Sequence, residues 1–127
     1  MKLAFLYSSN SKLIEIILDA CSKNEISLLK ESDFANFIYT LQDAVIDLII
    51  YDFVTSFENG LKHIKIIRKL KPKTPLIVIA DELDKDKGGK IYETNIFHLA
   101  IKPLSSDLIN QIITAAINDN KNKRDNY

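Results

Sequence analysis

The chain is poor in the features that stabilise secreted proteins or anchor membrane proteins. It contains one cysteine, Cys21, so it cannot form an internal disulfide, and this usage is typical of a reducing compartment. Its longest apolar runs are too short for a membrane span or for the core of a signal peptide. The sequence therefore predicts a cytoplasmic protein that has no membrane contact.

Net charge is absent as well. The 17 basic residues balance the 17 acidic residues, so no bulk field of one sign favours nucleic acid or a membrane surface as a partner. At 127 residues the chain is long enough for one domain with a real core. We expect residues 1–118 to form that domain and residues 119–127 to be a polar, disordered tail.

What the chain does contain is a regular alternation of short apolar runs and helical periodicity. The expected strands are residues 2–7, 25–30, 46–51, 76–80 and 96–101, and amphipathic patterns follow each of them. We expect the helix in residues 81–93 to be short, because Gly88 and Gly89 disfavour it. Alternation of this kind predicts an α/β fold with a parallel sheet and right-handed crossovers. At this size the usual form is the flavodoxin-like (βα)5 doubly wound sheet, with strand order 2-1-3-4-5.

The stretch from Val45 to Gly60 organises the rest of the chain. Its aliphatic first half suits a strand that helices bury on both faces, and Asp52 follows at the carboxyl end of that strand. In open α/β sheets this is the edge where ligands and chemistry collect. The expected strand order also places Ser8 and Ser9, after the first strand, beside Asp52.

Four features appear in a fixed order along the sequence. They are Asp52 after strand three, Gly60 at the expected start of helix three, a strand led by Pro75, and the pair Lys102-Pro103 after strand five. This order resembles the receiver domain of two-component response regulators, over the chain as far as Asn118. The resemblance implies that Asp52 is the phosphoacceptor and that Lys102 contacts the phosphoryl group. A carboxylate attacks phosphorus only when charge on the phosphoryl oxygens is neutralised, which agrees with these roles.

The chain departs from the family in three features. Ser8 and Ser9 stand where receivers carry the acidic pair that binds Mg²⁺ with the acceptor, so Asp52 alone predicts a weak magnesium site. Ala80 stands at the position of the switch Ser or Thr, and Leu99 at that of the switch aromatic residue.

Two functional interpretations follow from these departures. The first is an atypical receiver that works as a protein-interaction module in phosphorelay signalling, with compromised magnesium-dependent phosphorylation and a histidine kinase or output protein as partner. The alternative is a conventional receiver that a histidine kinase phosphorylates on Asp52. In neither case do we expect an enzyme beyond self-phosphorylation. A flavin or nucleotide binder of the same fold is disfavoured, because the serines after strand one lack accompanying glycine.

Other residues have structural as well as functional interpretations. Lys102 beside Asp52 is either a catalytic contact or a structural ion pair. Asp81 and Glu82 either supply a metal-binding carboxylate or cap a helix. His63, on the charged side of helix three, and His98 have no neighbouring residues at ligand spacing, which favours structural roles.

The first and last helices carry more apolar residues than one sheet contact needs. The surplus residues are Ile14, Leu18, Leu108 and Ile112. They form either an exposed patch, which would allow a homodimer or another partner contact, or a more deeply buried contact between the two helices.

Overall fold

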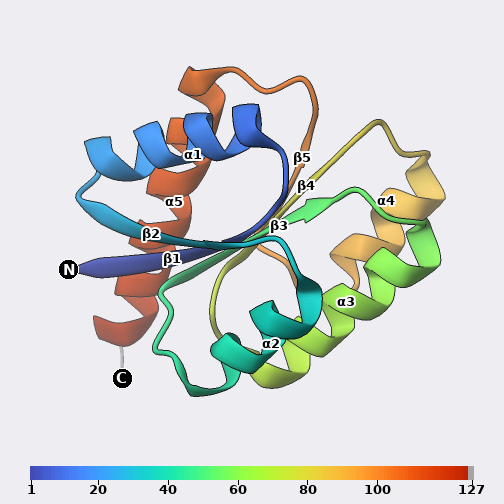
Figure 1. Cartoon of the computed structure of the whole chain (residues 1–127), viewed down its shortest axis with the longest axis horizontal. Coiled ribbons are helices and arrows are strands. Elements are labelled where there is room, and N and C mark those ends of the chain that lie inside the picture. The colour runs from blue at the N-terminus through green and yellow to red at the C-terminus, as the bar shows by residue number, and fades with distance from the viewer. Residues whose placement is uncertain (126–127) are drawn as a thin grey trace.

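The computed structural model describes the backbone of residues 1–125 and the side chains of residues 1–119. Strands and helices alternate along the whole of this range (Figure 1). In chain order the elements are β1 (Lys2–Tyr7), α1 (Ser11–Lys23), β2 (Ile26–Glu31), α2 (Phe34–Asp43), β3 (Leu48–Phe53), α3 (Phe57–Leu70), β4 (Leu76–Ala80), α4 (Lys85–Tyr92), β5 (His98–Ile101) and α5 (Ser106–Asp125).

The strands form one parallel sheet in the order β2-β1-β3-β4-β5. Helices α1 and α5 cover one face, and α2, α3 and α4 cover the other (Figure 1). The predicted flavodoxin-like sheet and its strand order are therefore confirmed. The central strand β3 is buried along its full length, as its uninterrupted apolar sequence predicted.

Alternation along the strands sorts the side chains into two cores. Leu6, Leu48 and Ile50 belong to the core beneath α1 and α5, whereas Phe5, Ile49 and Tyr51 belong to the core beneath α2, α3 and α4. Strands β1 and β3 pair in register, with Leu6 opposite Ile50 and Tyr7 opposite Tyr51. Ser8 and Asp52 are the next residues of this register, so both lie on the side of α1 and α5.

Two expected boundaries around the centre of the chain are wrong. Strand β3 begins at Leu48 and continues through Asp52 to Phe53, so Asp52 lies inside the strand. Helix α3 begins at Phe57 and not at Gly60, because the Ser56 hydroxyl accepts a hydrogen bond from the Asn59 amide and caps the helix earlier.

Strands β1 and β4 have the expected boundaries, and those of β2 and β5 differ from the expected ones by one or two residues. Helix α4 is short, as predicted, and Asp84 caps it by accepting from the Lys87 amide. The backbone of α5 is helical to Asp125, past Asn118, where we expected the domain to end. Residues 126–127 and the side chains after Asp119 lie outside the described residues, so the expected disorder of the tail stays a prediction.

The apolar surplus of α1 and α5 is divided between the core and the surface. Ile112 is 7% exposed and Ile14 packs against the core, whereas Leu18 and Leu108 are 48% and 40% exposed. Asn24, which caps α1, donates from Nδ2 to Oδ1 of Asn110 on α5 at 2.8 Å and so holds the two helices together. The larger exposed patch considered from the sequence is therefore reduced to two leucines.

Cys21 belongs to the same core. Its thiol is buried, and burial raises its pKa to about 11, as expected for an inert thiol. No helix in the described part of the chain combines the length and the apolar character that a transmembrane span requires.

The close contact between Gly60 and Phe53 provides a test of how β3 and α3 pack. A Cβ atom at Gly60 would lie 2.2 Å from Cζ of Phe53, which is itself in the core. We expect Gly60→Ala to lower the free energy of unfolding by about 1–3 kcal/mol, because the ring has to move. Gly89→Ala is the matched control, since it meets no atom within 4 Å and should raise stability by up to about 1 kcal/mol. Urea denaturation measures both, and equal effects would contradict the packing.

Candidate functional site

Asp52 of β3 is buried and contacts residues that directly follow two other strands. Its side chain is 1% exposed, and Oδ2 accepts a hydrogen bond of 2.8 Å from the Ser8 hydroxyl at the end of β1. Ser8 is buried too, and its Oγ accepts from the Asn10 amide at 3.1 Å, which fixes the hydroxyl beside the carboxylate. Ser9 is exposed and takes no part in this network.

Lys102 supplies the opposite charge. Its Nζ lies 2.9 Å from Oδ1 of Asp52, and its side chain is 21% exposed. The backbone positions this lysine, because its amide donates to the carbonyl of Ala80 at 2.8 Å, directly after β5. The structure therefore brings together the sequence-predicted pair of Asp52 and Lys102, and it adds Ser8 as the third member.

The residues present fit Mg²⁺ poorly. Mg²⁺ is normally held by one or two carboxylates together with water. Asp52 already has one oxygen against a hydroxyl and the other against an ammonium group. Asp81 and Glu82 are exposed, and the described residues contain no group of three or more His, Cys, Asp or Glu side chains that would hold a metal ion.

Ala80 and Leu99, which the resemblance places at switch positions, lie in the same part of the sheet. Ala80 ends β4, is buried, and pairs in register with Phe53 on one side and Ile101 on the other. It has no hydroxyl to offer a phosphoryl group. Leu99 lies in β5, and its amide donates to the hydroxyl of Tyr92 on α4 at 3.2 Å.

Sequence reasoning missed an aromatic cluster on the opposite side of β3. Tyr7 and Tyr51 stack at 5.2 Å, and the Tyr51 hydroxyl lies 2.8 Å from Nδ1 of His63. The His63 ring stacks on Phe34 at 3.6 Å, so this residue faces α2 and does not belong to the charged side of α3. Burial lowers the pKa of His63 and raises that of Tyr51, which favours the neutral form of both side chains. The sequence signal that could have revealed this cluster was a tyrosine in each of two apolar strands that were expected to pair, Tyr7 and Tyr51.

An apolar pocket of about 300 Å³ lies next to Lys102. Leu13 and Ile16 of α1 line it on one side, and Pro103 and Leu104 line it on the other. The pocket is therefore placed between α1 and the segment that joins β5 to α5, close to the buried carboxylate.

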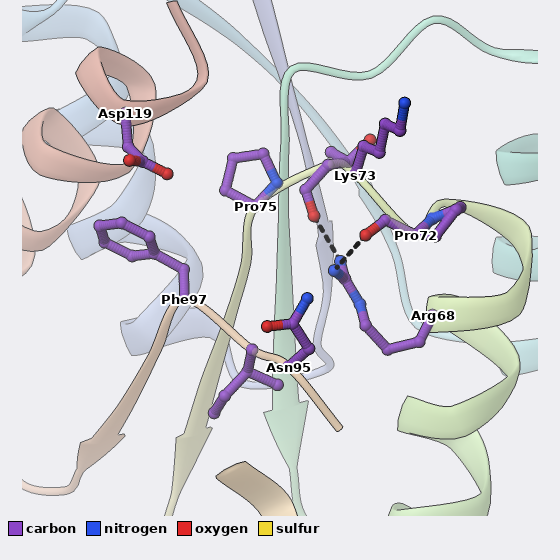
Figure 2. Close-up of a pocket in the computed structure, with 9 residues that line it drawn as sticks. Arg68, Pro72, Lys73, Pro75, Asn95, Phe97 and Asp119 are labelled. Atoms are coloured by element: carbon purple, nitrogen blue, oxygen red, sulfur yellow. Dashed lines mark hydrogen bonds between the residues drawn. The ribbon is translucent and has the colours of Figure 1, made fainter. Parts of the chain in front are cut away.

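A second pocket, of about 260 Å³, lies at the opposite edge of the sheet. Pro75 and Phe97 line it directly before β4 and β5, as Figure 2 shows. The guanidinium of Arg68 donates to the carbonyls of Pro72 and Thr74, marked by the dashed lines, and so holds the connection between α3 and β4. Because Asp52 lies at the carboxyl ends of the strands, this pocket is separate from the Asp52 site.

Comparisons with known proteins point to one kind of domain. No protein-family model matches the chain, and no curated protein does. Among solved structures, a CheY-like receiver domain protein from Methanospirillum hungatei has a TM-score of 0.85 at 9% identity, with 97% of this chain and 98% of that one covered. A response regulator from Thermotoga maritima has a TM-score of 0.84 at 19% identity, covering 93% and 98%. NtrX from Brucella abortus has a TM-score of 0.82 at 16% identity, covering 98% of this chain and 28% of NtrX.

These identities are low, so the likeness concerns the fold. The chain has the fold of response regulator receiver domains over nearly its whole length, as the sequence features predicted.

The ion pair at the site gives the first prediction. Lys102→Met should lower the free energy of unfolding by about 3 kcal/mol at pH 7, because it leaves the Asp52 carboxylate buried without its counter-charge. Adding Asp52→Asn should recover most of that loss. Lys12→Met, which removes an exposed lysine nearby, is the control and should change stability by less than about 0.5 kcal/mol. A double-mutant cycle by urea denaturation measures the coupling energy between Lys102 and Asp52. Additive effects of the two substitutions would contradict the ion pair.

The second prediction concerns His63 and pH. Burial lowers the folded-state pKa of this imidazole below its ordinary value of 6.5, so the unfolded state binds protons more readily. The stability that neutral His63 contributes is therefore present above about pH 6.5 and is lost as the pH falls through the lowered pKa. His63→Gln keeps an acceptor for Tyr51 and should flatten the fall in stability. Denaturation series between pH 7 and 5 test this, with His98→Gln as control for loss of an imidazole elsewhere. Equal slopes for wild type and His63→Gln would count against it.

Proposed function

We propose that this chain is an atypical receiver module of two-component or phosphorelay signalling, which binds a partner protein with little or no magnesium-dependent phosphorylation. The receiver fold is the premise, and one observation carries the proposal. The Ser8 hydroxyl contacts Asp52 on the strand end where receivers carry acidic residues. A neutral hydroxyl brings no charge that attracts Mg²⁺.

The electrostatics of Asp52 support the same proposal. Phosphoryl transfer to a carboxylate requires cations that neutralise the negative charge on the phosphoryl oxygens, and in this chain Lys102 pairs with the acceptor. One ammonium group replaces the combined metal and lysine of a conventional receiver. Because Asp52 is 1% exposed, a phosphodonor also has to displace neighbouring groups before it reaches Oδ1 or Oδ2.

The partner we propose is a signalling protein, either a histidine kinase or an output protein. The apolar pocket beside Lys102 supports this, since Leu13, Ile16 and Leu104 offer a surface for an apolar side chain of another protein. A homodimer through α1 and α5 has weaker support from the structure than from the sequence, because Ile112 is in the core. We expect a cytoplasmic module without enzymatic activity beyond any self-phosphorylation.

A conventional receiver phosphorylated on Asp52 is the second candidate. The observation that favours it is the direct contact between the phosphoacceptor candidate and Lys102, at 2.9 Å. These residues match the phosphoacceptor and the lysine that contacts the phosphoryl group, as the resemblance to receivers implies. The two candidates differ in whether magnesium supports a covalent adduct.

Intact-protein mass spectrometry separates the two candidates. After incubation with acetyl phosphate and Mg²⁺, we expect no phosphoryl adduct on wild type, because the carboxylate pair is missing. A magnesium-dependent adduct that disappears in Asp52→Asn would support the conventional receiver instead.

A gain-of-function variant makes a negative result informative. Ser8→Asp combined with Ser9→Asp supplies the missing carboxylates beside Asp52 and should create magnesium-dependent labelling, which Asp52→Asn then abolishes. Calorimetric titration with Mg²⁺ should show tighter binding by the variant than by wild type. A folded variant that neither binds Mg²⁺ nor accepts phosphoryl would show that the serines are not the cause.

A further inference from the structure

The balanced net charge of the chain hides a strong local asymmetry. Between Glu58 and Asp81 there is no acidic residue, yet six of the 17 basic residues lie there. They are Lys62, Lys65, Arg68, Lys69, Lys71 and Lys73. The rest of the chain therefore carries an excess of six negative charges. Most of this positive segment is helix α3.

Part of this charge serves the fold. Arg68 donates to the carbonyls of Pro72 and Thr74, and Nζ of Lys71 donates to the carbonyl of Ala44 at 2.8 Å. Both side chains hold the C-terminal end of α3 to neighbouring segments. Three lysines of α3 have no such role, because no hydrogen bond or ion pair engages Lys62, Lys65 or Lys69 among the described residues.

These lysines share one side of the helix with an apolar residue. Lys62, Lys65, Ile66 and Lys69 follow the spacing of neighbouring side chains on a helix, and all four are exposed. We call this set the basic face. It is about 10 Å long, from a rise of about 1.5 Å per residue. Ile66, which is 41% exposed, lies at its centre.

Stabilisation of α3 accounts for only part of the basic face. A positive charge favours the last turn of a helix, which accounts for Lys69 but not for Lys62 or Lys65 further toward the N-terminus. Like charges at spacings of three and four residues repel each other on the helix surface. An apolar side chain at the centre of three unpaired lysines also has no role in solubility. Binding explains this combination better than folding does.

We infer that the basic face docks an acidic segment of the partner protein, with an apolar side chain that contacts Ile66. This inference rests on the proposed function, since it names the surface that the signalling partner uses. Oppositely charged groups around an apolar contact are typical of protein interfaces and speed up association. A short acidic segment touches only the basic face, whereas an extended polyanion such as a membrane or nucleic acid also meets the net negative remainder of the molecule.

The test uses a synthetic helical peptide that carries glutamates around one leucine on a single face. Titrated into ¹⁵N-labelled protein at low ionic strength, it should shift the amide resonances of residues 62–69 most strongly. The triple variant Lys62→Glu, Lys65→Glu, Lys69→Glu should weaken binding at least tenfold. Ile66→Ser should weaken it at least threefold, with the charge unchanged.

The matched control makes the same change in charge at other positions. Lys30→Glu, Lys85→Glu and Lys90→Glu alter three other exposed lysines to give the same net charge, and should change the affinity by less than threefold. Circular dichroism checks that both triple variants fold. Equal weakening by the two triple variants would overturn the inference, because it would mean diffuse attraction. Tighter binding to phosphatidylserine vesicles or duplex DNA than to the peptide, at the same ionic strength, would overturn the inference as well.

Failure of the docking inference is distinguishable from failure of the proposed function. Mass spectrometry with acetyl phosphate reports only on Asp52, and the α3 variants leave Asp52, Ser8 and Lys102 in place. A protein that takes no phosphoryl group and does not bind the peptide would retain the proposed function and lose this docking surface.

Discussion

The structure depends on how the chain accommodates a negative charge inside its sheet. Asp52 lies in a strand that is buried along its full length, and an unpaired carboxylate there would be strongly destabilising. Lys102 and Ser8 approach it from β5 and β1, which follow and precede it by long stretches of chain. The compensation therefore requires the parallel order that places β1 beside β3, and it requires the end of β5 to reach across β4.

The same arrangement links the fold to the proposed function. In a conventional receiver the carboxylate would share its surroundings with further acids and a metal ion, so its environment would change when the metal or a phosphoryl group arrives. In this chain the Ser8 hydroxyl donates to Oδ2, and the Lys102 ammonium group lies beside Oδ1, which has no hydrogen-bond partner among the described residues. The charge of the carboxylate is therefore balanced by a residue of the chain itself. Ala80 and Leu99 fit this picture, because neither side chain can form a hydrogen bond to report a phosphoryl group.

The two faces of β3 carry different groups. Asp52 points toward α1 and α5, where the pocket beside Lys102 lies, and Tyr51 points toward the aromatic cluster with His63 on α3. Helix α3 thus has an inner side fixed by stacking and hydrogen bonding, and an outer side that carries the basic face. Its inner side packs closely on β3, with Gly60 against Phe53, and this packing places the backbone that carries the lysines. Partner binding on this helix would act on a surface directly backed by the central strand.

The sequence by itself determined the five alternating strands and helices, because apolar periodicity is a local property. The order of the strands followed from the usual form of a sheet of this size, and the pairing of Asp52 with Lys102 followed from the resemblance to receivers. It did not determine the start of α3, where the Ser56 cap prevailed over the glycine signal. Only the tertiary structure decided that Ser8 binds Asp52 while Ser9 faces solvent, that His63 stacks on Phe34, and that Ile112 is buried while Leu108 is exposed. These outcomes depend on which side chains of distant segments meet, and no pattern within a single segment carries that information.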